Sequence, residues 1–516
     1  MARGTRAAIG IATALLLTGM LVPLWAADWT RAGGDLGHTN VSSERTATPL
    51  SLIWKYYTGY MRDNPTTPLG VGGKIFFGGV EPSTTEYVPH FYCLSAETGE
   101  KVWDAPVDYR IRTPAAYWDG MIYFGTDDGT VYGLDAANGK ARWSYKTGRA
   151  VRCAPNVDSG MVFIGSSDRK LYAINAAGGD DVWKYPGDDA FNSSPVVAGD
   201  RLYAASADGY LVSLEKKTGK PIWRRRVAEG QLSAPLVIKD NTIYAVAADR
   251  LLALDTETFG VRWKKQSNSR LTTGIAVTDK SVFLPTPSGW LFAFDPANGD
   301  LQWRYHSDTP LTSTPLVVGD VVIVGAEGAM ILAIGAERGE LRWRYRTEGP
   351  VGGEGQAGYH HIAGSPTFCD GSLYVYSDEG NLYRFGAAQP DAVPPLVSLL
   401  TPAEGQYVSG WPPLVVGAKV YDPGSGLDES SVQLELDGKV LSHQFDQRNS
   451  HIYLEFKVKS GRNEPLEDGP HTVVVKAKDC RGNVVERTWR FNSDKNLPTV
   501  TPPQSAPGTA GGVPTG

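Results

Sequence analysis

The sequence predicts an all-β chain in which an eight-bladed β-propeller, closed by an N-terminal strand, precedes a β-sandwich. Three observations carry this prediction: a tryptophan recurs every 40 residues, turn dipeptides separate short strands between those tryptophans, and the repeat stops well before the end of the 516-residue chain. The 59 glycines and 34 prolines agree with it, because tight turns between many short strands use both residue types.

The repeat is regular enough to define its unit. Six consecutive intervals of 40 residues, without an insertion, separate Trp103, Trp143, Trp183, Trp223, Trp263, Trp303 and Trp343. Such a period indicates stacked supersecondary units. Between Thr113 and Trp143 the chain reads TPAAYW, MIYFGT, TVYGLD and KARWSY, separated by Asp-Gly, Asp-Gly and Asn-Gly pairs. These pairs favour two-residue hairpins, so each unit is expected to form four antiparallel strands, the content of one propeller blade.

The two ends of the repeat region complement each other. The phrase LIWKYYTG around Trp54 matches only the fourth strand of a unit, whereas residues 364–386 match only the first three strands and contain no tryptophan. We therefore expect the N-terminal strand to complete the last blade, which gives eight blades over residues 28–388. The recurrent tryptophans, Trp54 included, are predicted to dock neighbouring blades, with each indole N–H near turn backbone.

Residues 1–27 have the pattern of an export signal. Arg3 and Arg6 precede an apolar run from Ala7 to Trp25, and small residues follow it. An uncleaved anchor is the alternative, and no other stretch is apolar enough to span a bilayer. We expect a periplasmic or extracellular protein without a membrane span after signal removal. The net charge of −6 argues against a nucleic-acid partner, and the oligomeric state stays open.

The cysteines carry no recognisable chemistry. Cys93, Cys153, Cys369 and Cys480 are widely scattered, without a CxxC or CxxCH motif. This spacing excludes a zinc ribbon and an attached haem, and it favours free buried thiols over a disulfide framework.

Two insertions into the repeat mark a candidate binding site. The first lies in residues 80–90 of blade 1 and the second in residues 347–363, which lead into blade 8. Both connections are expected on one face, at the edge where blades 8 and 1 meet, and loops on a rigid scaffold commonly carry function. They contribute the candidates Glu86, Tyr87, His90, Glu354, Gln356, Tyr359, His360 and His361. Adjacent histidines rarely bind one ion, so exposed histidines are favoured and no metal ligand is assigned.

Four arginines in nearby turns extend this candidate site: Arg110, Arg112, Arg149 and Arg152. Arg112 and Arg152 hold the same position before the innermost strand of successive blades. They could face the channel mouth and attract an anion or an acidic peptide, but ordinary surface pairing is favoured. Acidic residues of the second hairpins are assigned to turn formation rather than to calcium binding; these are Asp127, Asp128, Asp208, Asp378 and Glu379.

The phrase Leu-Asp-x-x-x-Gly-Lys-x-x-Trp at 134–143 resembles the pyrroloquinoline-quinone (PQQ) repeat with its tryptophan-docking motif. The opening DWTRAGGDLGHTN, residues 28–40, is also similar to the start of such propellers. The resemblance extends from residue 28 to about 388 and implies one of two classes. One comprises quinone-dependent dehydrogenases; the other comprises non-catalytic propellers similar to the lipoprotein subunit of the outer-membrane protein assembly machinery.

The dehydrogenase class binds its quinone under a vicinal Cys-Cys disulfide, with calcium ligands, and has long insertions between blades. This chain has no adjacent cysteines, and blades 2 to 7 have minimal loops. We therefore expect a non-catalytic binding or scaffold protein of the cell envelope or surface, with a protein or envelope component as partner and no cofactor. The alternative is a PQQ- and calcium-dependent oxidoreductase that acts on alcohols or sugars.

After the repeat, residues 389–396 form a Pro-rich linker and residues 397–493 alternate as short strands do. The phrases YDPGSGLDESSV and LEDGPHTVVVKAKDCRGN resemble a bacterial immunoglobulin-like domain, which implies a spacer or a second contact. Asp422, Asp428 and Asp479 are assigned to turns, with calcium ligation as the alternative. Residues 494–516 are rich in Pro, Gly and Thr and are expected to be disordered.

Overall fold

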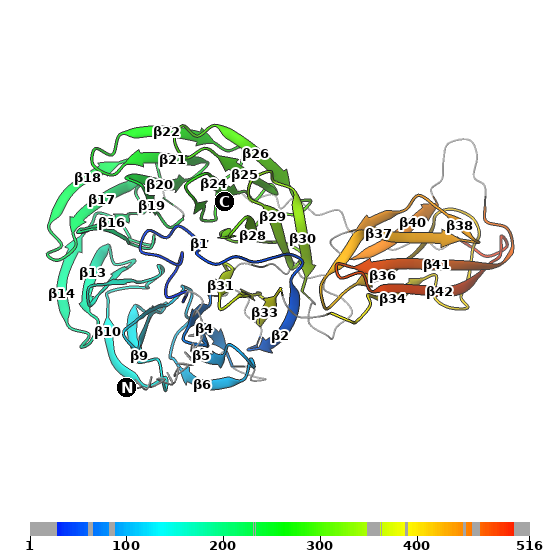
Figure 1. Cartoon of the computed structure of the whole chain (residues 1–516), viewed down its shortest axis with the longest axis horizontal. Coiled ribbons are helices and arrows are strands. Elements are labelled where there is room, and N and C mark those ends of the chain that lie inside the picture. The colour runs from blue at the N-terminus through cyan, green and yellow to red at the C-terminus, as the bar shows by residue number, and fades with distance from the viewer. Residues whose placement is uncertain are drawn as a thin grey trace, which may run out of the picture.

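The computed structural model describes residues 28–59, 66–81, 88–230, 232, 234–347, 362, 364–387, 391–446, 450–456 and 465–499. Over these ranges the regular structure consists of β-strands alone, which confirms the all-β class. They include no helix long and apolar enough to cross a membrane. The expected signal and almost all of the expected tail lie outside the described residues. Two parts follow one another along the chain: a ring of small sheets and a C-terminal unit (Figure 1).

The described part of residues 41–386 contains eight small sheets around a common centre (Figure 1). In seven of these sheets the strands follow one another in chain order from the centre outward. The first four sheets contain β3 (Leu69–Val71), β4 (Lys74–Val80), β5 (Pro89–Ser95) and β6 (Lys101–Pro106); β7 (Ala116–Trp118), β8 (Met121–Gly125), β9 (Thr130–Asp135) and β10 (Ala141–Lys146); β11 (Asn156–Asp158), β12 (Met161–Gly165), β13 (Lys170–Asn175) and β14 (Asp181–Pro186); and β15 (Val196–Ala198), β16 (Arg201–Ala205), β17 (Tyr210–Glu215) and β18 (Pro221–Arg226).

The next three sheets repeat this order, and a short N-terminal strand joins the last of them. They contain β19 (Val237–Lys239), β20 (Thr242–Ala247), β21 (Arg250–Asp255) and β22 (Val261–Gln266); β23 (Ala276–Val277), β24 (Val282–Pro285), β25 (Trp290–Phe294) and β26 (Leu301–His306); and β27 (Leu316–Val318), β28 (Val321–Ala326), β29 (Met330–Gly335) and β30 (Leu341–Arg346), with β1 (Val41–Ser42) parallel to β27.

The remaining sheet joins the two ends of the ring. Its three inner strands, β31 (Thr367–Cys369), β32 (Ser372–Tyr376) and β33 (Asn381–Gly386), are consecutive. Its outer strand is β2 (Ser51–Tyr57), which pairs antiparallel with β33 so that Trp54 lies opposite Arg384. The inner strands β31 and β3 are neighbours, and the Thr367 hydroxyl donates to the Pro68 carbonyl at 2.7 Å. Because β2 pairs with β33, the outer edge of that sheet is covered by a strand distant in sequence.

The recurrent tryptophans link consecutive sheets through one repeated hydrogen bond. In five of them the indole N–H donates to the carbonyl 33 residues later: Trp103 to Ala136, Trp143 to Ala176, Trp183 to Lys216, Trp263 to Pro296 and Trp303 to Ala336. Trp54 makes the corresponding bond to Ala96. The accepting turn contains a glycine at positive φ, and the indole covers that glycine.

One unit departs from this rule. Phe259 stands where the other turns have glycine, and it adopts a positive φ of 54°. Phe259 is buried, and the indole nitrogen of Trp223 is buried without a hydrogen-bond partner among the described residues.

The turn glycines allow a matched test of this contact. Gly179→Ala and Gly199→Ala both place a side chain at positive φ, a cost of about 1–2 kcal/mol. A Cβ at Gly179 would lie 2.7 Å from Trp143 Cδ2, whereas a Cβ at Gly199 would meet nothing within 4 Å. We therefore expect Gly179→Ala to lower the free energy of unfolding by about 1–3 kcal/mol more than Gly199→Ala does, measured by urea denaturation. Equal losses would contradict a tight glycine–indole contact.

The C-terminal unit consists of two sheets that share one core. One contains β34 (Leu396–Thr401), β36 (Leu414–Tyr421), β40 (His451–Phe456) and β39 (Gln444–Asp446); the other contains β35 (Tyr407–Val408), β42 (Val484–Ser493), β41 (Gly469–Asp479), β37 (Leu427–Leu436) and β38 (Lys439–Val440). Val416 and Ile452 from the first sheet pack with Leu434, Val475 and Trp489 from the second. The alternating sequence thus buries one face of each sheet.

The C-terminal unit contacts the ring at the sheet that is completed by β2. In the other ring sheets, the hairpin turn between the third and fourth strands lies against the tryptophan of the preceding sheet. No such hairpin joins β33 to β2, because these two strands are far apart in sequence. The carbonyl of Ser425, in the C-terminal unit, accepts the Trp343 indole N–H at 2.7 Å instead. The Gly424 carbonyl accepts the Leu52 amide at 3.0 Å, and Arg344 makes two hydrogen bonds to Glu429. The turn at 423–426 therefore occupies the place of the missing hairpin turn.

Candidate functional site

The centre of the ring is crossed by residues 28–45, which we call the axial segment (Figure 1). This segment hydrogen-bonds to the inner edges of the ring sheets in chain order. Its partners are Gly70 with Trp29, Tyr117 with Thr30, Val157 with Arg31, Val197 with Leu36, Ile238 with Gly37, Val277 with Thr39, Val317 with Asn40 and Gly371 with Glu44. Six of these contacts join main-chain groups of both partners, whereas Arg31 uses its guanidinium and Glu44 uses its carboxylate. The segment thereby holds all the ring sheets together.

The conformation of the axial segment follows from its sequence. Gly37 approaches β19 so closely that a Cβ there would lie 2.4 Å from the Ile238 carbonyl oxygen. His38 and Asn40 both adopt positive φ, near 57°, a region that these residue types occupy more readily than most. The Asp35 carboxylate accepts the Thr39 amide at 3.0 Å and so stabilises the turn between them.

Asn156 fixes the segment at its middle. Its side chain is fully buried, and its amide nitrogen donates to the carbonyls of Leu36 and Pro195, both at 3.2 Å. Its amide oxygen accepts a hydrogen bond from Arg31 Nη1 at 3.0 Å. Arg31 Nη1 also donates to the Val157 carbonyl at 2.7 Å. One buried amide therefore binds both the axial segment and the next sheet.

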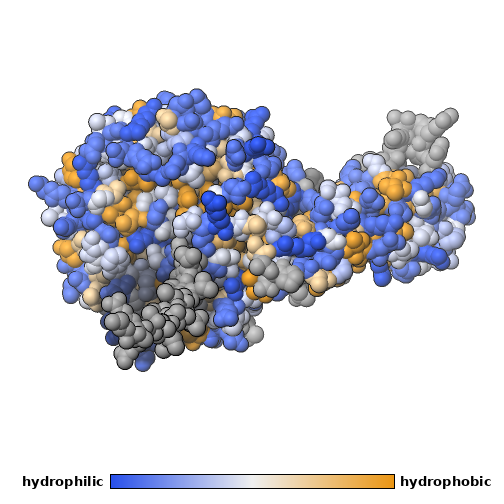
Figure 2. Space-filling model, viewed as in Figure 1, coloured by the Kyte–Doolittle hydropathy of each residue, from blue (hydrophilic) through white to orange (hydrophobic). Residues whose placement is uncertain are grey.

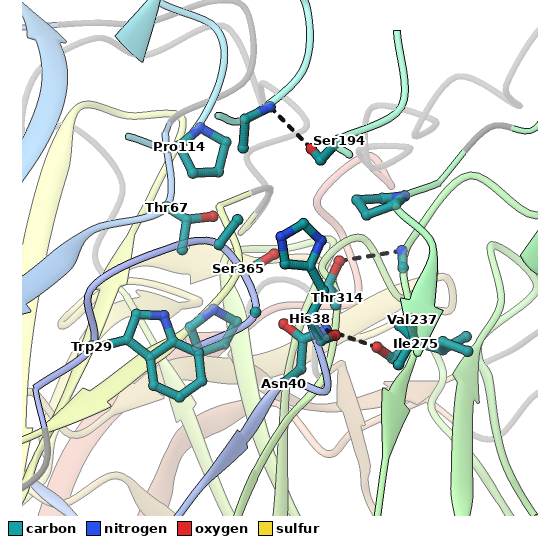
Figure 3. A pocket seen from close by; sticks show the side chains of 16 residues that line it. Trp29, His38, Asn40, Thr67, Pro114, Ser194, Val237, Ile275, Thr314 and Ser365 are labelled. Carbon is teal, nitrogen blue, oxygen red and sulfur yellow. Dashed lines mark hydrogen bonds between the residues drawn. The ribbon is translucent and has the colours of Figure 1, made fainter. Parts of the chain in front are cut away.

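Beside the axial segment lies a small central cavity of about 80 Å³ (Figure 3). Its wall includes one residue just before the inner strand of each ring sheet: Thr67, Pro114, Ala154, Ser194, Pro235, Gly274, Thr314 and Ser365. Two nitrogens of its lining are buried without a hydrogen-bond partner among the described residues, Trp29 Nε1 and His38 Nδ1. A water molecule occupies about 30 Å³, so the cavity has room for two or three waters bound to such groups.

Burial controls the charge of this cavity. Desolvation, with the neighbouring Arg31 charge, lowers the pKa of His38 to about 3. The imidazole is therefore neutral at physiological pH. Burial also lowers the pKa of Arg31, against the attraction of Asp158 and Asp35. The cavity thus presents neutral polar groups rather than a charged imidazolium.

The pKa of His38 predicts a pH effect on stability. In unfolded chains histidine binds a proton below about pH 6.5, whereas folded His38 does so only near its lowered pKa. Acid therefore favours the unfolded state. We expect His38 to lower the free energy of unfolding by up to about 1.4 kcal/mol per pH unit as the pH falls from about 6 to 4.5. His38→Asn, which also tolerates positive φ, should remove that part of the slope in urea titrations. Parallel curves for both proteins would contradict a neutral His38.

The predicted site at the meeting of the two insertions lies largely beyond the described residues. Glu86, Tyr87, Glu354, Gln356, Tyr359, His360 and His361 all fall there. His90 is described: it is buried on β5, its Nδ1 lies 2.7 Å from Asp104 Oδ2, and its Nε2 lies 3.6 Å from Glu81. His90 therefore contributes to the pairing between β5 and β6.

The structure brings two of the four predicted arginines to one carboxylate. Arg112 Nε lies 2.5 Å from Asp127 Oδ2, and the more exposed Arg152 lies 4.0 Å from Asp127 Oδ1. This is the surface pairing that the sequence favoured, but one carboxylate serves two guanidinium groups. The Arg110 carbonyl accepts the Asp127 amide, and the Arg149 carbonyl accepts the Thr147 hydroxyl at 2.7 Å.

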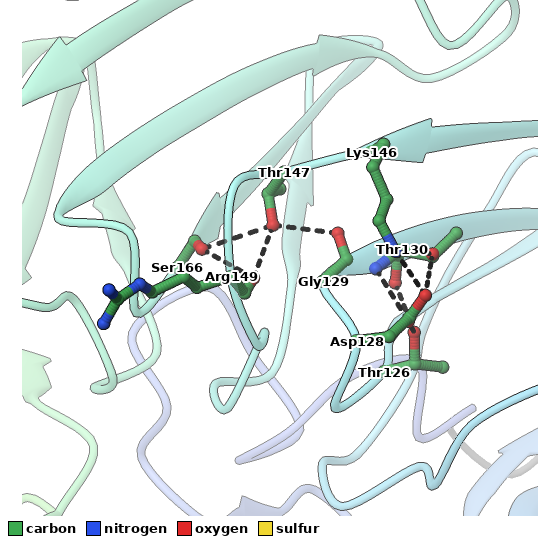
Figure 4. A network of polar contacts seen from close by, with 8 residues as sticks. All are labelled: Thr126, Asp128, Gly129, Thr130, Lys146, Thr147, Arg149 and Ser166. Atoms are coloured by element: carbon green, nitrogen blue, oxygen red, sulfur yellow. Dashed lines mark hydrogen bonds and ion pairs between the residues drawn. The ribbon is translucent and has the colours of Figure 1, made fainter.

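Asp128 shows how the turn acids act (Figure 4). It accepts hydrogen bonds from the Thr126 hydroxyl and the Thr130 amide at 2.6 and 3.1 Å, and it pairs with Lys146. Partial burial opposes ionisation, but these donors outweigh it and lower the pKa of Asp128 to about 2. The Thr147 hydroxyl, bonded to Gly129 O, receives a hydrogen bond from Ser166 of the next sheet. The network stabilises a turn and links two sheets.

A larger hollow lies between the ring and the C-terminal unit. This junction groove has a volume of about 690 Å³ and contains residues of both signs, including Arg342, Arg344, Glu429, Lys478 and Arg481. Sequence reasoning did not find it, because the groove exists only where two separately predicted domains meet.

The central cavity does not fit the quinone that one branch of the resemblance implies. Pockets for organic ligands commonly have volumes of about 300–1,000 Å³, several times that of the central cavity. The four cysteines are free, Cys93, Cys153 and Cys369 being buried, so they form no vicinal disulfide. We therefore derive no redox step through such a group.

Comparisons with known proteins identify the family to which this chain belongs. The family model of the outer membrane protein assembly factor BamB matches residues 90–305 and 287–444, more than half of the chain. The chain belongs to this family. The match also confirms the resemblance to the PQQ-like repeat proteins. No curated protein matches the sequence.

Several solved structures share the fold at low sequence identity. BamB from Moraxella catarrhalis is 18% identical with a TM-score of 0.54, and the alignment covers 67% of this chain and 100% of that one. Quinohemoprotein alcohol dehydrogenase from Comamonas testosteroni is 16% identical with a TM-score of 0.59, covering 74% and 83%. The corresponding enzyme ADHIIG from Pseudomonas putida HK5 is 15% identical with a TM-score of 0.58, covering 73% and 83%. At these identities the likeness shows the fold alone.

Proposed function

We propose that the chain is an exported, non-catalytic scaffold of the cell envelope or cell surface that binds a protein partner or an envelope component. In this proposal the ring is an eight-bladed β-propeller, and the C-terminal unit is an immunoglobulin-like domain that serves as a spacer or second contact. The family of an outer membrane protein assembly factor supports a role in binding proteins.

The axial segment is the observation that carries the proposal. It occupies the centre of the ring and leaves a cavity of about 80 Å³, which suits ordered water better than a substrate and a cofactor. A ring filled in this way offers its outer surface and its loops for binding. On the face in Figure 2, apolar side chains form separate patches among hydrophilic ones, which favours a partner contact with a large polar share.

The alternative is a PQQ- and calcium-dependent dehydrogenase, favoured by the fold likeness to quinohemoprotein alcohol dehydrogenases. The test is reconstitution of the purified chain with PQQ and calcium, followed by dye-linked oxidation of primary alcohols and of glucose. We expect neither quinone binding nor turnover. Turnover above that of a heat-denatured control would overturn the proposal.

For the partner contact, we propose the surface around Arg110, Arg112, Arg149 and Arg152. Arg152 is 59% exposed and lies 4.0 Å from Asp127, so its guanidinium can pair with a carboxylate from an acidic segment of the partner. Crosslinking in the native envelope, followed by purification, should recover one partner in constant ratio to the chain. We expect Arg152→Ala to reduce this recovery several-fold and Arg142→Ala, an exposed arginine paired with Asp135, to leave it unchanged. Equal recovery would place the contact elsewhere.

A further inference from the structure

Three carboxylates converge beside the junction between the ring and the C-terminal unit. Asp391 comes from the linker, Asp422 directly follows β36, and Asp479 ends β41. One oxygen of each carboxylate lies within 4.8 Å of the other two. Asp422 and Asp479 are buried, with side chains of 4% and 2% relative exposure. Asp428, the other acidic residue considered from the sequence, instead accepts hydrogen bonds from Ser430.

No basic side chain of the described residues neutralises this charge. Among the described residues, none of the three carboxylates forms an ion pair with a lysine, arginine or histidine. Arg481 is adjacent in sequence to Asp479, but its guanidinium donates to the carbonyls of Pro49 and Ala387 in the ring. Burying an unpaired negative charge costs free energy, so a bound cation would stabilise this arrangement.

An unpartnered oxygen points to a ligand independently of the clustering. Asp422 Oδ2 accepts the amides of Gly424 and Gly426, at 3.0 and 2.8 Å. Asp422 Oδ1 is buried and has no hydrogen-bond partner in the described part of the chain. Burial and the charges of Asp391 and Asp479 raise the pKa of Asp422 to about 6. A carboxylate in these surroundings is stabilised when a metal ion occupies its free coordination position.

The backbone is shaped to hold these carboxylates together. The Ser425 amide donates to Asp391 Oδ2 at 2.7 Å, and the Arg481 and Asn483 amides donate to Asp479 Oδ1, both at 2.8 Å. A Cβ at Gly424 would lie 2.2 Å from Asp391 Oδ2, so the approach of Asp391 requires glycine there. The orientation of each carboxylate is therefore fixed by main-chain groups.

We propose that Asp391, Asp422 and Asp479 bind one calcium ion, which locks the linker and the C-terminal unit onto the ring. Hard oxygen ligands favour Ca²⁺ or Mg²⁺ over zinc, and Ca²⁺ accepts the irregular geometry of three carboxylates completed by water. The turn that follows Asp422 carries the Ser425 carbonyl that accepts the Trp343 indole N–H. Arg481, next to Asp479, binds ring carbonyls. The ion would thus stabilise both turns that contact the ring.

The site is tested with the full chain by titration with calcium chloride after treatment with EDTA, read by calorimetry and by thermal unfolding. We expect one calcium ion per chain and a rise in Tm of several degrees. Asp422→Asn should weaken calcium binding by about 100-fold and abolish the rise in Tm. Asp428→Asn, outside the cluster, is the matched control and should behave like the wild type.

The variants also separate metal binding from a purely structural role. Removing one repelling carboxylate should leave Asp422→Asn at least as stable as the wild type in EDTA, so a loss of the calcium effect would not reflect misfolding. Asp391→Asn, on the linker, should weaken binding in the same way. Absence of binding in the wild type, undiminished binding in Asp422→Asn, or equal stabilisation by Mg²⁺ would each overturn the calcium assignment. None of these outcomes bears on the quinone assay, so the two proposals can fail separately.

Discussion

Trp143→Ala is expected to lower the free energy of unfolding by about 3–5 kcal/mol. The Trp143 side chain is 9% exposed and donates its indole N–H to the Ala176 carbonyl at 2.9 Å. It also covers Gly179 in the same turn and contacts the ring of Tyr123. The substitution would therefore open a cavity between two sheets and remove one of the two hydrogen bonds to the Ala176 carbonyl, which also accepts the Tyr123 hydroxyl at 3.0 Å. Urea denaturation followed by far-UV circular dichroism measures the loss.

A second tryptophan provides the control for this prediction. Trp411, in the C-terminal unit, is 39% exposed, and its side chain is outside the shared core of the two sheets. Trp411→Ala should change the free energy of unfolding by much less than Trp143→Ala, because little apolar surface is lost from a buried site. Similar losses for the two variants would contradict the docking role of Trp143, because it would then contribute no more than a partly exposed tryptophan.

The repeat made the architecture of the ring predictable, because each unit encodes its own structure locally. Short turns, alternating strands and regularly spaced tryptophans recur along the ring, so local and tertiary preferences agree. Even the pairing of β2 with β33 could be inferred, since one end of the repeat lacks what the other supplies. The positive φ of Phe259 was not predicted, because the other units have glycine at that position of the turn.

The candidate sites were less predictable, for a physical reason. Contacts across the ring axis and across the junction join residues far apart in sequence, and no local spacing encodes them. Residues 28–40 were noted as an opening phrase, yet nothing in it indicated that Arg31 would reach Asn156. Asp422 and Asp479 were considered as calcium ligands from the sequence, and so was Asp428, which lies outside the cluster. Asp391 was not considered, because it lies in the linker. Surface pairing was favoured for Arg112 and Arg152, but Asp127 was assigned to a turn and was not predicted as the carboxylate that they approach.

The axial segment gives the second prediction with a large effect. If the axial segment holds the ring sheets together, then removing the contact at the middle of this segment should destabilise the whole ring. Asn156 is that contact, because its amide binds the segment at Arg31 and Leu36 and the next sheet at Pro195. Asn156→Leu keeps nearly the same volume but removes every one of these hydrogen bonds.

We expect Asn156→Leu to lower the free energy of unfolding by about 3–5 kcal/mol, since several buried polar groups lose their partners at once at about 1–3 kcal/mol each. Limited proteolysis under native conditions should also cut the variant within residues 28–45 earlier than the wild type, because the axial segment would be released more often. Asn298→Leu, at an exposed turn where the Asn298 amide oxygen accepts the Asp300 amide, is the control and should show neither effect. Wild-type stability in Asn156→Leu would mean that the main-chain hydrogen bonds of the axial segment suffice to close the ring.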